Sequence, residues 1–329
     1  MYLEYYQLKD EPFRLTPDPR FVHFTEPHQA ALTVLLEGIL YRKGLIMITG
    51  PIGTGKTTLI HTALQMLTDV RKQKMLIRSA LLFNPTLTRD EFLEMMLDDF
   101  EVSCPSVSKP RRLMALQEML LETQRQKGTA VLFIDEAHLL STELLEEIRL
   151  LGNADLHQEK LLQIVLSGQP ELIPLMQRRE LSALQQRIAG RAHLRPLTLS
   201  EIRAYVAERL HLAGLRGPSP FPSDTLETVL EYSTGVPRLI NLVCDACLTL
   251  GYRTGRTVIQ PSMVEEVAIS LNLADPALVV HKAGGSAYSG LGTTQQNESV
   301  NSFASRGVQK SIVDSLIDAM KQNRTTVTR

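Results

Sequence analysis

A glycine-rich segment that directly follows an apolar run constrains the fold of this chain more than any other feature. Residues 45–49 are apolar enough to form a buried strand, and the sequence continues as Gly50-Pro51-Ile52-Gly53-Thr54-Gly55-Lys56-Thr57. This stretch fits the pattern G-x-x-x-x-G-K-[ST], in which glycines let consecutive backbone N–H groups curl around phosphates. Residues 56–67 then have the periodicity of a helix, whose N-terminus adds partial positive charge. The strand, loop and helix therefore predict a phosphate-binding loop and not a chance glycine turn.

The side chains of this loop have separate expected tasks. We expect Lys56 to reach the β- and γ-phosphates of ATP, and Thr57 to ligate Mg²⁺ through its hydroxyl. ATP and Mg²⁺ are thus the two cofactors that the sequence predicts. The expected nucleotide-binding residues of the loop are Gly50, Pro51, Ile52, Gly53, Thr54, Gly55, Lys56, Thr57 and Thr58.

A second motif lies about eighty residues later, where an apolar strand at 131–134 ends in two carboxylates, Asp135 and Glu136. Parallel sheets bind ligands at the carboxyl ends of their strands. We expect Asp135 to hold the water shell of Mg²⁺ and Glu136 to orient or deprotonate the attacking water. The alternative is a solvated acidic turn. The full run Asp-Glu-Ala-His is also a helicase signature, but the chain after Pro196 is too short and too helical for a second helicase domain.

Apolar strands alternate with helices over the first two thirds of the chain. Strands are expected at 45–49, 74–82, 129–134, 161–166 and 191–195, which predicts an α/β fold with a five-stranded parallel sheet sandwiched by helices. After Pro196 only helices are expected. The predicted organisation is an N-terminal arm and linker helix (1–40), an α/β domain (41–196), a helical lid (197–273), a disordered linker (274–307), a short amphipathic helix (308–323) and a disordered end (324–329).

Composition excludes some classes of function. Lys and Arg total 35 against 36 Asp and Glu, so no global field marks a dedicated nucleic-acid or membrane binder. The longest apolar runs fall far short of the about 18 residues of a membrane span, and no secretory signal is readable, so we expect a cytoplasmic protein without membrane insertion. Cys244 and Cys247 lie in a helical apolar run, where buried thiols are favoured over a metal or redox site.

Three further positions are candidates for contacts with the γ-phosphate. Ser167 or Gln169, after the fourth strand, could sense it, although both could instead serve a simple turn. Arg187 precedes the last strand, where an arginine can project across a subunit boundary toward a neighbour's phosphate, with Arg191 as the alternative. Arg238, at the start of a lid helix, is expected to reach the γ-phosphate from the lid.

Between Arg178 and Arg216 the sequence has eight arginines and three glutamates. The nearly equal numbers of basic and acidic residues in the whole chain conceal this local excess. Some of these arginines could contact nucleic-acid phosphates, while ordinary surface salt bridges are the alternative.

Together, the phosphate loop, the Asp-Glu strand end, the arginine before the last strand and Gly235-Val236-Pro237-Arg238 resemble an AAA+ ATPase. More narrowly, the segment from Glu11 to Phe21 and the run Gly168-Gln169-Pro170-Glu171-Leu172 are similar to the general secretion pathway protein A family. Over residues 1–273 the resemblance implies a P-loop sheet domain with a helical lid, nucleotide between them, and a homo-oligomeric ring or filament. It also implies that residues 14–21 pack near the adenine, where the alternative is a surface arm that only anchors the N-terminus.

Members of that family commonly continue into a membrane span and a peptidoglycan-binding domain, and we expect neither in this chain. Three functions stay open. The first is ATP hydrolysis that drives assembly or remodelling of a secretion, pilus or exopolysaccharide-export machine. The second is a DNA-associated ATPase of the transposition-regulator type. The third is a nucleotide-switched scaffold with little turnover. A protein partner could dock on the helix at 308–323.

Overall fold

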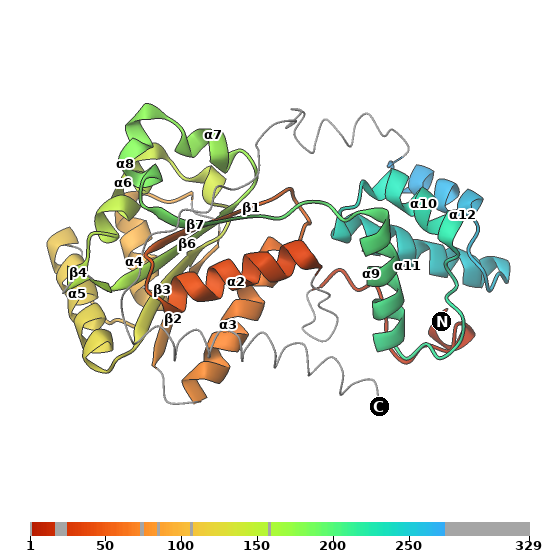
Figure 1. Ribbon diagram of the computed structural model, residues 1–329, viewed down its shortest axis with the longest axis horizontal. Helices are drawn as coiled ribbons and strands as arrows, with labels where there is room; N and C mark the ends of the chain where they lie inside the picture. Colours follow the sequence, from red (N-terminus) through yellow and green to blue (C-terminus); the bar gives the residue numbers. More distant parts are fainter. Residues whose placement is uncertain are drawn as a thin grey trace, which may run out of the picture.

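The computed structural model describes residues 2–16, 25–72, 76–83, 86–105, 108–156 and 159–273 of the 329. Figure 1 shows two parts side by side, a sheet flanked by helices and a group of helices that follows it in the chain. The linker, amphipathic helix and end expected at 274–307, 308–323 and 324–329 lie outside the described residues. In the residues that are described, no helix combines the length and apolarity needed to cross a bilayer.

The sheet has five strands that all pair in parallel, as the alternating sequence pattern predicts. Their order across the sheet is β2-β3-β6-β1-β7, so the strand before the phosphate loop lies between two neighbours. The strands are β1 (Leu45–Thr49), β2 (Ile77–Leu82), β3 (Thr129–Ile134), β6 (Leu162–Gly168) and β7 (Ile188–His193).

Successive side chains of each strand enter two different cores. On β1, Leu45 and Met47 pack with one layer of helices, while Ile46 and Ile48 pack with the other. The first layer contains α4 (Arg89–Asp99), α5 (Lys109–Arg125), α6 (Thr142–Leu151) and α7 (Leu172–Met176). The second contains α2 (Glu26–Leu40) and α3 (Lys56–Lys72). Because both faces are covered, the central strands are buried throughout and largely apolar, which made them readable from sequence.

The last strand differs from its expected position at 191–195, because β7 begins at Ile188 and ends at His193. It lies at the edge of the sheet, and its residues alternate between half-buried and exposed. An edge strand needs no continuous apolar run, so Ala-Gly-Arg-Ala can occupy it. Several short elements also escaped the sequence pattern, among them α1 (Tyr2–Tyr5), α7, α8 (Ser182–Gln185) and the hairpin of β4 (Asp155–Leu156) and β5 (Glu159–Lys160).

The helical part surrounds its own core, which contains Cys244 and Cys247. Burial raises the pKa of the Cys247 thiol to about 12 and that of Cys244 well above its usual value, which disfavours the thiolates that metal or redox chemistry needs. The described residues hold no cluster of three or more potential metal ligands. The helices of this part are α9 (Leu199–Leu212), α10 (Ser223–Ser233), α11 (Pro237–Thr254) and α12 (Pro261–Ser270).

The first residues of the chain pack against this helical part, although the whole sheet lies between the two in the sequence. Phe13 is buried there, with its ring edge-on to Phe221 at 5.9 Å between centroids. The carbonyl of Pro12 accepts a hydrogen bond from Nε of Arg209. Most of the segment expected near the adenine, 14–21, lies outside the described residues. Within the described part of that segment, Arg14 pairs with acidic residues of the same arm.

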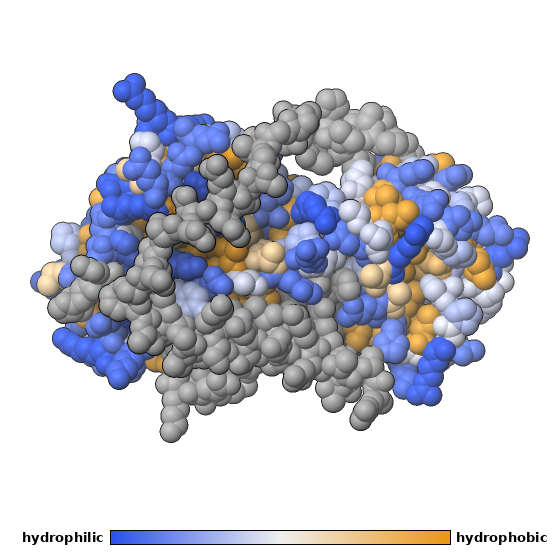
Figure 2. All heavy atoms as spheres, viewed as in Figure 1, coloured by the Kyte–Doolittle hydropathy of each residue, from blue (hydrophilic) through white to orange (hydrophobic). Residues whose placement is uncertain are grey.

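Figure 2 shows hydrophilic residues over much of the sheet part and apolar patches on the helical part. Exposed apolar side chains of the helical part include Tyr252, Val258 and Ile269. Scattered exposed residues of this kind are normal in proteins, and we attach no function to them.

Candidate nucleotide-binding site

The predicted phosphate loop connects the carboxyl end of β1 to the first turn of α3. Gly53 and Gly55 have φ angles of +79° and +96°, which side chains other than glycine rarely tolerate. The backbone N–H of Gly50 donates to the carbonyl of Gly168 at 3.2 Å, which fixes the start of the loop to the neighbouring strand. The loop is therefore bent by its glycines and anchored to the sheet.

Lys56 turns back into the loop that precedes it. Its buried Nζ donates to the carbonyl oxygens of Gly50 at 2.7 Å and Pro51 at 3.0 Å. Burial lowers the pKa of Lys56, while the charges of Glu136, Asp135 and Glu171 raise it. A cation held inside a ring of backbone groups has the position that phosphate recognition requires, and charged phosphate oxygens are stronger acceptors than carbonyls.

Asp135 joins three elements at the carboxyl edge of the sheet. Its Oδ2 accepts a hydrogen bond from Oγ1 of Thr57 at 2.7 Å. Its Oδ1 accepts from Oγ of Ser167 at 2.8 Å and from the N–H of Glu136 at 3.0 Å. The structure thus brings together the hydroxyl, the carboxylate and the strand exit that the sequence separates by more than a hundred residues.

Thr57 and Asp135 fit the expected Mg²⁺ ion by donor type, because Mg²⁺ prefers oxygen ligands and keeps several of its waters. Their side-chain oxygens lie 2.7 Å apart and share a hydrogen bond, so the hydroxyl that would ligate the ion lies beside the carboxylate that would hold its water shell.

Glu136 adopts a left-handed backbone conformation, with φ 51° and ψ 36°. Its Oε2 is buried and has no hydrogen bond to the described residues, but it lies 3.3 Å from Nδ1 of His138. The same Nδ1 faces the backbone N–H of Gln169 at 3.4 Å. His138 therefore lies between the ends of β3 and β6, beside the candidate base. Of the two candidate phosphate sensors, Ser167 has its hydroxyl on Asp135, whereas Gln169 contacts His138 through its backbone.

The helical part touches the phosphate loop where α11 begins. The N–H of Arg238 donates to the carbonyl of Gly53 at 3.3 Å. A Cβ atom placed on Gly53 would lie 2.9 Å from Cβ of Arg238 and 2.9 Å from Cγ1 of Val236. Arg238 itself is exposed. The structure therefore brings this predicted residue to the loop, with its side chain accessible to a ligand.

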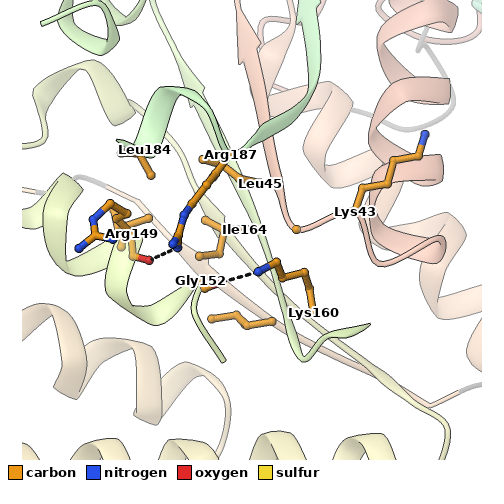
Figure 3. A pocket seen from close by; sticks show the side chains of 11 residues that line it. Lys43, Leu45, Arg149, Gly152, Lys160, Ile164, Leu184 and Arg187 are labelled. Carbon is orange, nitrogen blue, oxygen red and sulfur yellow. Dashed lines mark hydrogen bonds between the residues drawn. The ribbon is translucent and has the colours of Figure 1, made fainter. Parts of the chain in front are cut away.

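Arg187 lies at the amino ends of the strands, whereas the phosphate loop of its own chain lies at their carboxyl ends. It immediately precedes β7, and its Nη1 donates to the carbonyl of Arg149 at 2.9 Å (Figure 3). It lines a pocket with Leu45 and Leu162, the first residues of β1 and β6. The structure does not bring Arg187 to the other predicted site residues within one chain. Arg191, the alternative, is exposed on β7.

The arginine-rich stretch between Arg178 and Arg216 does not form one uniform basic surface. Arg209 is buried in the helical part, and Arg195 and Arg203 form ion pairs with glutamates. Ordinary salt bridging therefore accounts for part of the local arginine excess.

Two histidines at the site carried no recognisable sequence signal. His28 on α2 lies 2.8 Å through Nε2 from the carbonyl oxygen of Thr54. His193, at the end of β7, lies 3.0 Å through Nδ1 from Oγ1 of Thr49, and burial together with the charge of Lys56 lowers its pKa. Both contacts join segments far apart in the chain, so no local pattern could reveal them.

Comparisons with known proteins identify relatives of this chain. A family model described as an AAA domain matches residues 18–176. The chain is 36% identical over 256 residues to general secretion pathway protein A of Aeromonas hydrophila, covering 78% of this chain but 46% of that protein. It therefore spans about half the length of this curated relative.

Solved structures show the same fold at low identity. The Aeropyrum pernix ORC2 protein in ADPNP–ADP complexes aligns with a TM-score of 0.60 and 17% identity, covering 80% of this chain and 72% of that one. The Drosophila ORC bound to DNA aligns with a TM-score of 0.64 and 16% identity, covering 83% and 66%. At such identities the likeness shows the fold alone.

Proposed function

This chain belongs to the AAA+ ATPases that resemble general secretion pathway protein A, and from that premise we propose that it hydrolyses ATP with Mg²⁺ to drive an export machine. The machine would be one for secretion, pilus assembly or exopolysaccharide export, and ATP turnover would power its assembly or remodelling. The observation that carries the proposal is the hydrogen bond between Thr57 of the phosphate loop and Asp135 of the acidic strand end. It joins the two motifs of a hydrolytic nucleotide site.

The residues around this bond have complementary tasks in the proposed reaction. Lys56 and the loop N–H groups bind the phosphates, and Thr57 and Asp135 hold Mg²⁺, which when bound neutralises charge on the phosphate oxygens. Glu136 directly follows Asp135 and orients or deprotonates the attacking water. Arg238 contacts the γ-phosphate from the helical part, because its backbone already touches Gly53.

The position of Arg187 supports a homo-oligomer. An arginine at the far edge of the sheet stabilises a phosphate only if that phosphate belongs to a neighbouring subunit. Repeated head-to-tail contacts of this kind produce a ring or a filament. The rate of ATP hydrolysis would then depend on whether the subunits are assembled. The link to an export machine is proposed from the similarity to general secretion pathway protein A of Aeromonas hydrophila, of which this chain covers 46%.

The enzymatic part of the proposal is tested by measuring ATP hydrolysis and nucleotide binding of the purified chain with Mg²⁺. Glu136→Gln should bind ATP like the wild type and lose turnover by about 100-fold or more, because a positioned base contributes 10²–10⁴ in rate. Lys56→Ala should lose binding as well. Glu143→Gln, which changes an exposed glutamate of α6, is the matched control and should keep full activity.

Turnover by the wild type no faster than by Glu136→Gln, with normal binding in both, would leave only the nucleotide-switched scaffold. Salt-dependent DNA binding that disappears when Arg178, Arg179 and Arg191 are neutralised would instead support the DNA-associated ATPase. The export role is tested in cells. Deleting the gene should abolish one export process, and wild type but not Glu136→Gln should restore it.

A further inference from the structure

The phosphate loop is held from outside by a buried histidine of α2. His28 is 6% exposed, and its ring links the phosphate loop to the residue that precedes α2. Nε2 lies 2.8 Å from the carbonyl oxygen of Thr54, and Nδ1 lies 2.7 Å from Oγ1 of Thr25, the residue before the helix. The ring also lies against Gly55, where an added Cβ would come within 3.4 Å of Nε2.

The carbonyl of Thr54 assigns the proton of Nε2. A carbonyl oxygen can only accept a hydrogen bond, so Nε2 of His28 carries the proton and donates to Thr54. In the neutral ring Nδ1 is then the acceptor, and the hydroxyl of Thr25 donates to it. Thr25 thereby keeps the ring in the orientation that points its N–H at the loop.

The direction of the Thr54 carbonyl matters because the loop must present N–H groups to an anion. A peptide unit that turned its carbonyl oxygen toward the phosphates would replace a donor with a repelling acceptor. Gly53 and Gly55 flank Thr54 and are the residues that allow such a rotation most easily. The His28 hydrogen bond opposes that rotation at the position between them.

We propose that His28 is a positioning residue that sets the conformation of the phosphate loop by holding the Thr54 carbonyl away from the nucleotide. The proposal rests on the proposed nucleotide-binding function, and it assigns to His28 no contact with ATP. The loop is braced on two sides: His28 of α2 holds Thr54, and Arg238 of α11 holds the adjacent Gly53.

The test measures the dissociation constant of a fluorescent ADP analogue for the full-length chain. His28→Leu keeps an apolar side chain but removes the donor, so the free loop is no longer held with the Thr54 carbonyl turned away. Binding should weaken about tenfold, which corresponds to about 1.4 kcal/mol. His28→Gln can place an amide N–H near Nε2 and should recover most of the affinity. Thr33→Ala is the matched control, because it removes a hydrogen bond within the same helix without touching the loop.

The outcomes separate this inference from the function on which it rests. If the wild type binds no nucleotide, the proposed function fails. If the wild type binds and Lys56→Ala does not, but His28→Leu binds as tightly as the wild type, the positioning role is overturned. A merely structural role would lower the melting temperature of His28→Leu and of His28→Gln alike and leave both dissociation constants unchanged.

A second variant covers the case in which His28→Leu does not fold. Thr25→Val leaves the histidine in place and releases the ring from its hydroxyl partner. It should weaken binding about threefold, in line with the loss of one ordinary hydrogen bond. Unchanged affinity in Thr25→Val, with the leucine variant unfolded, would also contradict the proposal.

Discussion

At the scale of single residues, Gly53 is restricted both by its backbone and by its neighbours. Its φ angle of +79° disfavours any side chain, and a Cβ there would lie 2.9 Å from atoms of Val236 and Arg238. The second restriction couples the phosphate loop to α11, because a methyl group could be accommodated only if the helix moved away. Gly255 has a similar φ of +69° but nothing within 4 Å of its Cβ position, so the chain offers a control with backbone strain alone.

We expect Gly53→Ala to weaken nucleotide binding by tenfold or more, since it distorts the loop and separates it from Arg238. Gly255→Ala should lower the free energy of unfolding by about 1 kcal/mol, from backbone strain, without changing affinity. Gly217→Ala, at a position with neither positive φ nor neighbours, should change neither quantity. Urea denaturation and titration with the ADP analogue measure both effects. Equal affinities of the Gly53 and Gly255 variants would show that contact with α11 is unimportant for the loop.

The roles expected for Lys56 and Thr57 could be derived from sequence because they depend on residues adjacent in the chain. Contacts such as Ser167 with Asp135 depend on which strands are neighbours, and one chain's alternation of strands and helices leaves that order open. His28 depends on the packing of α2 behind the loop, 26 residues away in sequence. The placement of the loop residues was therefore predictable from the sequence, and the long-range contacts that support the loop were not.

At the scale of elements, the buried strands were readable because their apolar runs reflect burial on both faces. The edge strand β7 begins three residues and ends two residues before its expected bounds. Helix α9 begins directly after a capping residue. Thr198 and Glu201 form a capping box, in which each side chain bonds the other residue's backbone N–H. Arg195 adds two hydrogen bonds to the carboxylate of Glu201, at 2.7 and 3.0 Å. This cluster fixes the first helix after the chain leaves the sheet.

The capping box predicts a pH-dependent contribution to stability. Arg195 first, and then Thr198, lower the pKa of Glu201 to about 2. Because the folded pKa is below the unfolded one, the contribution is complete above the unfolded value of about 4.3 and is lost as pH falls toward about 2. Glu201→Gln should therefore cost about 1–2 kcal/mol at pH 7, a difference that shrinks below pH 4.3.

Urea denaturation between pH 7 and pH 3.5 measures this difference. Glu227→Gln is the control, because Glu227 forms an exposed ion pair with Arg203, and such pairs contribute less than about 1 kcal/mol. A Glu201 effect that stayed constant over the whole pH range would mean that its charge does not stabilise the helix start.

At the scale of the whole molecule, the residues of the proposed site are divided between the two ends of the strands. Lys56, Asp135, Glu136 and Arg238 gather at the carboxyl edge, and Arg187 lies at the amino edge among the first residues of β1 and β6. Because the two groups of residues lie at opposite ends of the same strands, they cannot meet within one subunit. A complete site in the proposed mechanism therefore needs two copies of the chain, and this gives hydrolysis a dependence on assembly that binding does not have.

Mixing two inactive variants tests that division. Arg187→Ala should bind nucleotide normally and lose turnover by about 100-fold or more, since an arginine supplied across an interface contributes 10³–10⁵ in rate. Lys56→Ala should lose binding but keep its arginine. In a one-to-one mixture about a quarter of the interfaces pair an intact Lys56 with a neighbour's intact Arg187, so about a quarter of the wild-type rate should return if subunits exchange freely. Arg191→Ala, mixed in the same way, is the control and should be active alone. If mixed oligomers form but activity does not return at any ratio, Arg187 acts within its own subunit. If Arg191→Ala is inactive alone and Lys56→Ala rescues it, Arg191 has the role proposed for Arg187.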